Sequence, residues 1–152
     1  MKMFIRLFTC LFFLGGSALA QDISPILKFG LFADTQYADC TSENARFYRR
    51  ALRKLDTCIN YFNQQNVQFT INLGDIIDRK NSDLKKIMSS LAHLNNEIYH
   101  ITGNHDYKEV TDNSVLYRQL SMPSEYYSFK KQNWVFIMLN TNEAVSYTHL
   151  TL

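Results

Sequence analysis

Three short polar segments carry most of the side chains that could do chemistry in this chain. They are Asp34-Thr35-Gln36, Gly74-Asp75-Ile76-Ile77-Asp78 and Gly103-Asn104-His105-Asp106. Carboxylate oxygens, amide oxygens and imidazole nitrogens bind divalent cations such as Mn, Mg, Fe or Zn, and these segments contain no cysteine thiolate. Together they predict a metal site built mainly from oxygen ligands.

The spacing within the segments indicates how such a site could work. Asp34 and Gln36 are two residues apart, so on an extended segment both side chains can point the same way. Asp75 follows a glycine, where the backbone can turn tightly, and its carboxylate could bridge two metals. Two metals about 3.5–4 Å apart can hold a phosphate and activate a water for in-line attack. His105 is then available as a general acid, and Asp106 is expected to fix its ring orientation.

Each of these residues also has an ordinary interpretation when it is taken alone. Asp34 can cap a turn, Asn104 can be a simple loop residue, and His105 can be a structural histidine. The joint pattern favours a functional site, because each polar segment directly follows an apolar run.

The apolar runs are predicted strands that position the three segments. They cover residues 26–33, 67–73 and 97–101. One helix is predicted to start at Thr41 or Ser42 and to run to Phe62, and another to start at Asn81 or Ser82 and to run to Leu94. This alternation predicts an α/β fold with a parallel sheet. The three segments then meet at the carboxyl edge, where open α/β sheets bind ligands.

The later part of the chain is predicted to add a helix over 112–120 and two strands over 126–130 and 134–139. A polar turn around Gln132-Asn133 would join the two strands.

Five basic residues fall largely off the apolar stripe of the first predicted helix: Arg46, Arg49, Arg50, Arg53 and Lys54. A basic helix face can bind nucleic acid, but a solvated outer face is favoured here. Lys2 and Arg6 lie within residues 1–20, so the remaining 14 Lys and Arg balance the 14 Asp and Glu. No nucleic-acid partner is therefore expected.

The three polar segments, in this order, resemble the first three motif blocks of the calcineurin-like metallophosphoesterases. The resemblance implies a four-layer α/β/β/α sandwich, of which this chain would form a part, with two divalent metal ions. It implies that Asp34 and Gln36 bind the first metal, that Asp75 bridges both metals, and that Asn104 binds the second metal and the phosphate. It also implies that His105 is the general acid. Asp78 matches a supporting position of the motif and is given no ligand role.

Gln36 stands where the commonest pattern has histidine. With that glutamine, residues 29–39 and 74–78 are similar to the manganese-dependent ADP-ribose/CDP-alcohol diphosphatases. An amide oxygen is a harder ligand than imidazole, which favours manganese over the other candidate cations.

The same family completes its metal centre with later histidine blocks. His93 and His100 are interpreted as structural, and nothing after Asn140 matches those blocks. The chain is therefore expected to be an N-terminal portion with little activity of its own. Residues 146–152 resemble translated read-through of a sequencing adapter, with a divergent edge strand as the alternative.

Residues 1–20 have the layout of a secretory signal peptide. A basic start is followed by an apolar run over residues 7–14 and by Ala18-Leu19-Ala20, which predicts cleavage after Ala20. The alternative is a buried helix or a retained anchor, although the run is short for a bilayer. An exported protein, periplasmic or extracellular and without stable membrane insertion after cleavage, is expected, with the phosphoesterase domain over residues 21–145. Cys40 and Cys58 could form a disulfide there or remain free thiols.

The sequence therefore predicts a hydrolase of phosphoanhydride or phosphodiester bonds in small nucleotide-linked substrates. A broad phosphomonoesterase and a non-catalytic exported binding module are the alternatives. The expected partner is a small phosphorylated or nucleotide-diphosphate substrate, and no protein partner is expected.

Overall fold

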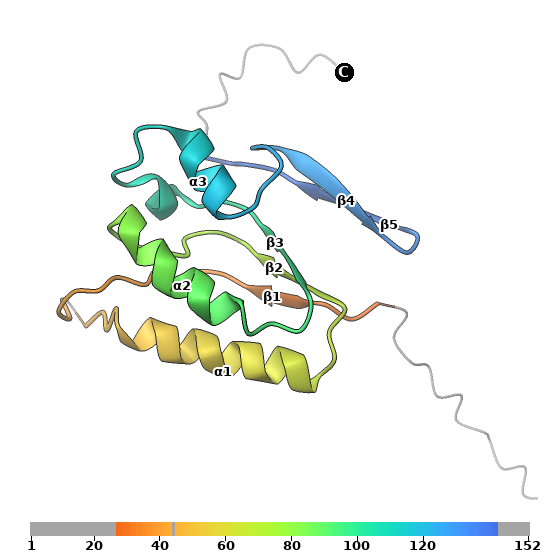
Figure 1. The fold of residues 1–152 in the computed structure, drawn as a ribbon, viewed down its shortest axis with the longest axis horizontal. Coiled ribbons are helices and arrows are strands. Elements are labelled where there is room, and N and C mark those ends of the chain that lie inside the picture. Colours follow the sequence, from red (N-terminus) through yellow and green to blue (C-terminus); the bar gives the residue numbers. More distant parts are fainter. Residues whose placement is uncertain (1–26, 44, 143–152) are drawn as a thin grey trace, which may run out of the picture.

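The computed structural model describes residues 27–43 and 45–142 (Figure 1). The predicted signal peptide and the tail at 146–152 lie outside the described residues. Within the described part, no helix has the length and apolar character needed to cross a bilayer.

A three-stranded parallel sheet forms the centre of the fold. Strand β1 (Gly30–Phe32) pairs with β2 (Phe69–Asn72), which pairs in turn with β3 (Glu97–His100). Leu31 lies opposite Ile71, and Ile71 opposite Tyr99. All four residues of β2 are buried, as expected for a central strand covered on both faces. The predicted parallel sheet is confirmed, although each strand is shorter than its apolar run.

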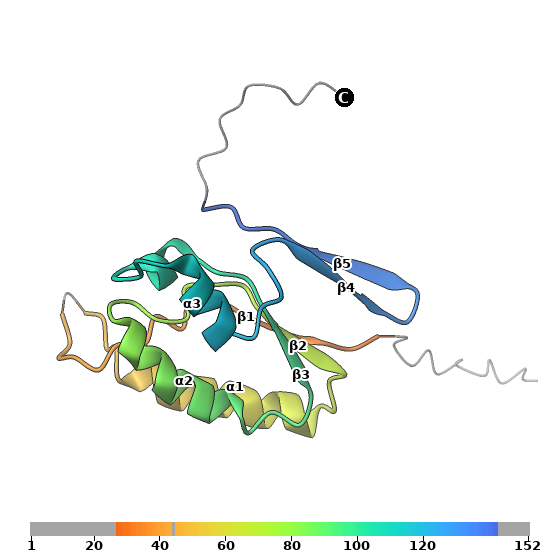
Figure 2. The same ribbon diagram turned by 45° about the horizontal axis from the view of Figure 1, so that its top comes forward.

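Helices α1 (Arg50–Gln64) and α2 (Leu84–Leu91) cover one face of this sheet (Figures 1 and 2). The predicted start of the first helix at Thr41 or Ser42 is wrong, because the chain makes a tight turn first. Glu43 and Arg46 exchange backbone hydrogen bonds of 3.2 and 2.8 Å, and Ala45 between them has a φ of 65°. A helix cannot pass through such a residue, so α1 begins only at Arg50.

The remaining helices complete this layer. A 3-10 turn, η1 (Asn81–Asp83), leads into α2, close to the predicted helix start. Helix α3 (Asn113–Gln119) is capped by Asp112, whose carboxylate accepts a hydrogen bond from the Ser114 backbone N–H. The core between the helices and the sheet contains the following buried residues: Tyr37, Leu55, Ile59, Ile76, Ile77, Leu84, Ile87, Leu91, Leu116, Leu120 and Met122.

A β-hairpin covers the other face of the sheet (Figure 2). Its strands are β4 (Tyr127–Lys131) and β5 (Trp134–Met138), as predicted, and the turn between them places Gln132 at a φ of 51°. Aromatic rings make the contact: Tyr99 stacks on Phe129 with centroids 3.5 Å apart, and Phe69 meets Phe136 edge-on at 5.1 Å. The sheet is thus enclosed between helices and hairpin.

Cys40 and Cys58 are both half-buried and are not bonded to each other. Of the two alternatives, a disulfide or free thiols, the structure has free thiols at these two positions.

Candidate active site

The three polar segments meet at the carboxyl edge of the sheet, as the strand order predicts. Main-chain hydrogen bonds hold them together: the Asp34 N–H donates to the Gly74 carbonyl at 3.1 Å, and the Gln36 N–H donates to the Asp75 carbonyl at 2.9 Å. The third segment joins through Asp106, whose carboxylate accepts from the Asp75 N–H at 2.9 Å. Residues far apart in sequence are therefore fixed side by side.

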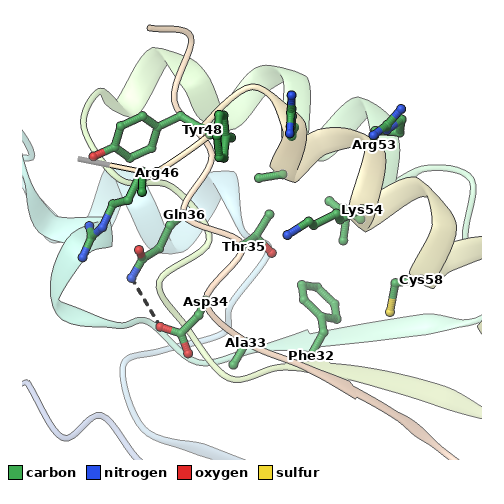
Figure 3. A pocket seen from close by; sticks show the side chains of 15 residues that line it. Phe32, Ala33, Asp34, Thr35, Gln36, Arg46, Tyr48, Arg53, Lys54 and Cys58 are labelled. Atoms are coloured by element: carbon green, nitrogen blue, oxygen red, sulfur yellow. Dashed lines mark hydrogen bonds between the residues drawn. The ribbon is translucent and has the colours of Figure 1, made fainter. Parts of the chain in front are cut away.

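The first polar segment is sharply turned, so the extended conformation predicted for it is wrong. Asp34 and Gln36 have φ values of 54° and 43°, in the left-handed region that non-glycine residues seldom occupy. The two side chains still meet, because Gln36 Nε2 donates to Asp34 Oδ1 at 3.3 Å (Figure 3). Backbone strain of this kind clusters at functional sites, and here it falls on two candidate ligands.

Asp75 lies where the loop after β2 closely approaches the loop after β3. It also has a positive φ, 52°, and it follows Gly74, whose φ is 101°. A Cβ on Gly103 would lie 2.1 Å from Asp75 Oδ1, and one on Gly74 would lie 2.5 Å from the Gly103 nitrogen. The same Oδ1 accepts a hydrogen bond from the His105 N–H at 2.8 Å. Both motif glycines are therefore required by contact with their neighbours.

Asp106 has a different role from the one predicted. Its carboxylate is fully buried and accepts hydrogen bonds from four backbone N–H groups, those of Gly103, Asp75, Ile76 and Ile77, at 2.8–3.2 Å. Burial raises the pKa of Asp106 above its ordinary value, against the lowering effect of these donors. The prediction that Asp106 orients the His105 ring is wrong; this carboxylate ties the second polar loop to the third.

Asp78 is the carboxylate that contacts the His105 ring. Its Oδ1 lies 2.6 Å from His105 Nδ1, and its side chain is only 4% exposed. Lys108 Nζ also lies 2.8 Å from the same Nδ1, and its side chain is 45% exposed. The buried Asp78 carboxylate therefore lies against the His105 ring and limits its orientation. The Gly-Asp-x-x-Asp spacing is the sequence signal for this residue, and it predicted only a supporting role for Asp78.

Asn104 opens a short 3-10 turn, η2 (Asn104–Tyr107), and its side chain is exposed at the same edge. Among the described residues, no three His, Cys, Asp or Glu side chains lie close enough together to hold a metal ion. The donors gathered at this edge are instead two carboxylates, Asp34 and Asp75, and two amides, Gln36 and Asn104.

A buried pair, Asn72 and His100, supports the second polar segment. The sequence did not indicate this connection with the site. Asn72 Oδ1 accepts from the Gly74 N–H at 3.2 Å, and Asn72 Nδ2 lies 3.2 Å from His100 Nδ1. His100 is buried, as expected for a structural histidine, and burial lowers its pKa to about 4. Only the register of β2 and β3, which places Asn72 opposite His100, reveals this pair.

A cavity of about 560 Å³ opens beside Asp34 and Gln36 (Figure 3). Its other wall comes from the start of α1 and the turn before it, and includes four basic residues: Arg46, Arg50, Arg53 and Lys54. These side chains are exposed, as expected of a solvated face. However, all four line one cavity beside the site. The predicted solvent exposure is therefore correct, but the prediction did not include this position next to the candidate ligands.

Comparison with known proteins gives consistent matches. The model of the calcineurin-like phosphoesterase family matches residues 27–149. The manganese-dependent ADP-ribose/CDP-alcohol diphosphatase of Arabidopsis thaliana is 36% identical over 102 residues, which cover 59% of this chain and 32% of that protein. The protein of the same name from Oryza sativa subsp. japonica is 32% identical over 126 residues, covering 72% and 39%.

A solved structure agrees with the fold. The crystal structure of a dimetal phosphatase from Danio rerio matches with a TM-score of 0.69 and 29% identity, over 77% of this chain and 45% of that one. The predicted fold class, part of a metallophosphoesterase sandwich, is therefore confirmed. The chain spans between about a third and two fifths of the length of the two plant relatives.

Proposed function

Since the chain belongs to the calcineurin-like phosphoesterase family, we propose that the protein hydrolyses small nucleotide-linked diphosphates, such as ADP-ribose and CDP-alcohols, with manganese. Relatives from two plants carry the name manganese-dependent ADP-ribose/CDP-alcohol diphosphatase. The observation that carries the proposal is the convergence of Asp34, Gln36, Asp75 and Asn104 from three loops on one edge of the sheet.

The donor set fits hard divalent cations. Asp34 and Gln36 would hold one ion, Asp75 would bridge two, and Asn104 would hold the second. The left-handed backbone at the first three of these residues is the kind of strain that a ligand-binding loop retains. When bound, two such ions would polarise the phosphate and make a neighbouring water more acidic.

The protein's own groups would then manage the position of the substrate and the leaving group. The His105 N–H holds Asp75 Oδ1 in place at 2.8 Å, so the Asp75 carboxylate does not rotate freely. The His105 ring would donate a proton from Nε2 to the departing oxygen, because Nδ1 is engaged by Asp78. Asp106 would act on neither substrate nor metal; it would keep the two loops at their working distance.

The test is metal binding and turnover by the purified full-length protein, first stripped of metal and then supplied with manganese or magnesium. ADP-ribose should be cleaved faster with manganese. Asp75→Asn should lose metal and turnover together, whereas Asp56→Asn, which removes an exposed carboxylate on α1 away from the cavity, should keep both. His105→Gln should keep its metal and lose about 10²–10⁴-fold in rate.

The outcomes separate the alternatives. Cleavage of simple monoesters alone would replace the diphosphatase proposal with a phosphomonoesterase. A full-length protein that binds neither metal nor phosphate ester would be a non-catalytic module, and the proposed hydrolysis would be rejected.

A further inference from the structure

The cavity beside the candidate metal centre is strongly cationic. Among the described residues that line it, Arg46, Arg50, Arg53 and Lys54 are basic, and Asp34 is the one acidic residue. In Figure 3, Lys54 extends from α1 toward the segment that carries Thr35, and Arg46 lies beside Gln36. Lys54 and Arg46 therefore lie toward the first polar segment, whereas Arg53 lines the cavity farther along α1.

Three of these four cations, Arg50, Arg53 and Lys54, have no counter-charge in the part of the chain that the structure describes. By contrast Arg49, on the same stretch of chain, lies 2.6 Å from Asp39, which also pairs with Lys86. Like charges gathered without an internal partner repel each other and create a positive potential that attracts an anion.

The shape of the site indicates the size of that anion. A cavity of about 560 Å³ matches the volume of a small-molecule site rather than a surface for a nucleic-acid duplex. Guanidinium and ammonium groups both bind phosphate oxygens through charge-assisted hydrogen bonds.

We propose that the wall formed by Arg46, Arg50, Arg53 and Lys54 binds the second phosphoryl group of a nucleoside diphosphate, the one that is not attacked. This inference rests on the proposed function, in which Asp34 and Gln36 hold the ion beside the reacting phosphate. The second phosphate of a diphosphate is then within the same cavity, on the side of α1. The wall determines specificity, because a monophosphate leaves these cations without a partner.

The experiment is calorimetric titration of the full-length protein with ADP-ribose and with AMP, both with manganese and with a chelator. The double variant Arg53→Gln, Lys54→Gln should bind ADP-ribose about tenfold or more weakly, while AMP changes by about twofold or less. Arg49→Gln is the matched control, since this arginine is paired with Asp39 and does not line the cavity. Lys54→Arg should retain the affinity for ADP-ribose. Added salt should weaken ADP-ribose binding more in the wild type than in the double variant.

Each outcome decides one of the two proposals. An equal loss of affinity for ADP-ribose and AMP, or no loss for either, overturns the assignment of the second phosphate. If ADP-ribose binds with the expected dependence on Arg53 and Lys54 but is never cleaved, the subsite stands and the proposed hydrolysis fails. Thermal unfolding of the double variant should match that of the wild type, which makes the binding comparison valid.

Discussion

Acidification should destabilise this fold through one buried histidine. His100 is 2% exposed, and its Nδ1 accepts the hydrogen bond from Asn72 Nδ2 in the neutral form of the ring. Among the described residues, its Nε2 has no hydrogen-bond partner. A proton added to this ring would be buried without a counter-charge, and it would displace the Asn72 amide that steadies the Gly74 N–H.

The size of the effect follows from the two pKa values. Burial lowers the pKa of His100 from 6.5 to about 4. Between these two pH values His100 binds a proton in the unfolded chain but not in the folded chain. The contribution of His100 to the free energy of unfolding is therefore fully present above pH 6.5 and falls as the pH drops toward 4. At pH 5 this histidine alone should cost about 2 kcal/mol, and the limit below pH 4 is about 3 kcal/mol. That is a large part of a typical domain's stability.

Urea unfolding followed by circular dichroism, at pH 7.5 and pH 5, measures the effect. From pH 7.5 to pH 5, the free energy of unfolding of the wild type should fall by about 2 kcal/mol more than that of His100→Gln. This difference does not depend on how much the glutamine destabilises the protein at pH 7.5. His93→Gln is the control, because His93 is exposed and should leave the loss unchanged. Equal losses in the wild type and His100→Gln would refute the reasoning and assign the acid sensitivity to other groups.

Three further substitutions and the predicted signal cleavage have definite expected results. Gly103→Ala places a methyl group 2.1 Å from Asp75 Oδ1, so urea unfolding should show a loss of about 1–3 kcal/mol and titration should show weaker manganese binding. Asp106→Asn replaces one of the two acceptor oxygens with an NH2 donor that faces buried backbone N–H groups. It should cost about 1–3 kcal/mol by the same unfolding assay, an unchanged midpoint being the contrary result. Ile137→Lys replaces a side chain that is 68% exposed on β5 and should change the stability measured by urea unfolding by less than about 0.5 kcal/mol. Export predicts a mature protein that begins at Gln21 in mass spectra from the native host, and an intact Met1 would contradict it.

The sequence by itself was enough to locate the edge of the sheet that carries the candidate site. Asp34, Asp75 and Asn104 each follow an apolar run, and parallel strands must deliver the residues after them to the same edge. Periodicity likewise predicted α2, α3 and the β4–β5 hairpin close to their observed bounds. These features depend on local pattern, which a linear sequence records.

The sequence did not determine where α1 begins. Thr41 and Ser42 are good capping residues, and the apolar steps from Ala45 onward suit a helix. The chain instead turns at Ala45, and Glu43 there pairs with Arg79, which lies in the loop after β2. A contact with a residue as distant in sequence as Arg79 leaves no periodic pattern near Glu43. Local helix propensity therefore predicted a start at Thr41 or Ser42 instead of Arg50.

The partners of the buried carboxylates were also settled only by the tertiary structure. Asp106 is next to His105 in sequence, yet its side chain turns inward to four backbone N–H groups, while Asp78 reaches the His105 ring from another loop. The side of α1 on which Arg53 and Lys54 meet the cavity depends in the same way on how the helix packs on the sheet. Residue types and strand order determine which groups gather at an edge; the paths of the loops and the packing of the helix decide which of those groups touch.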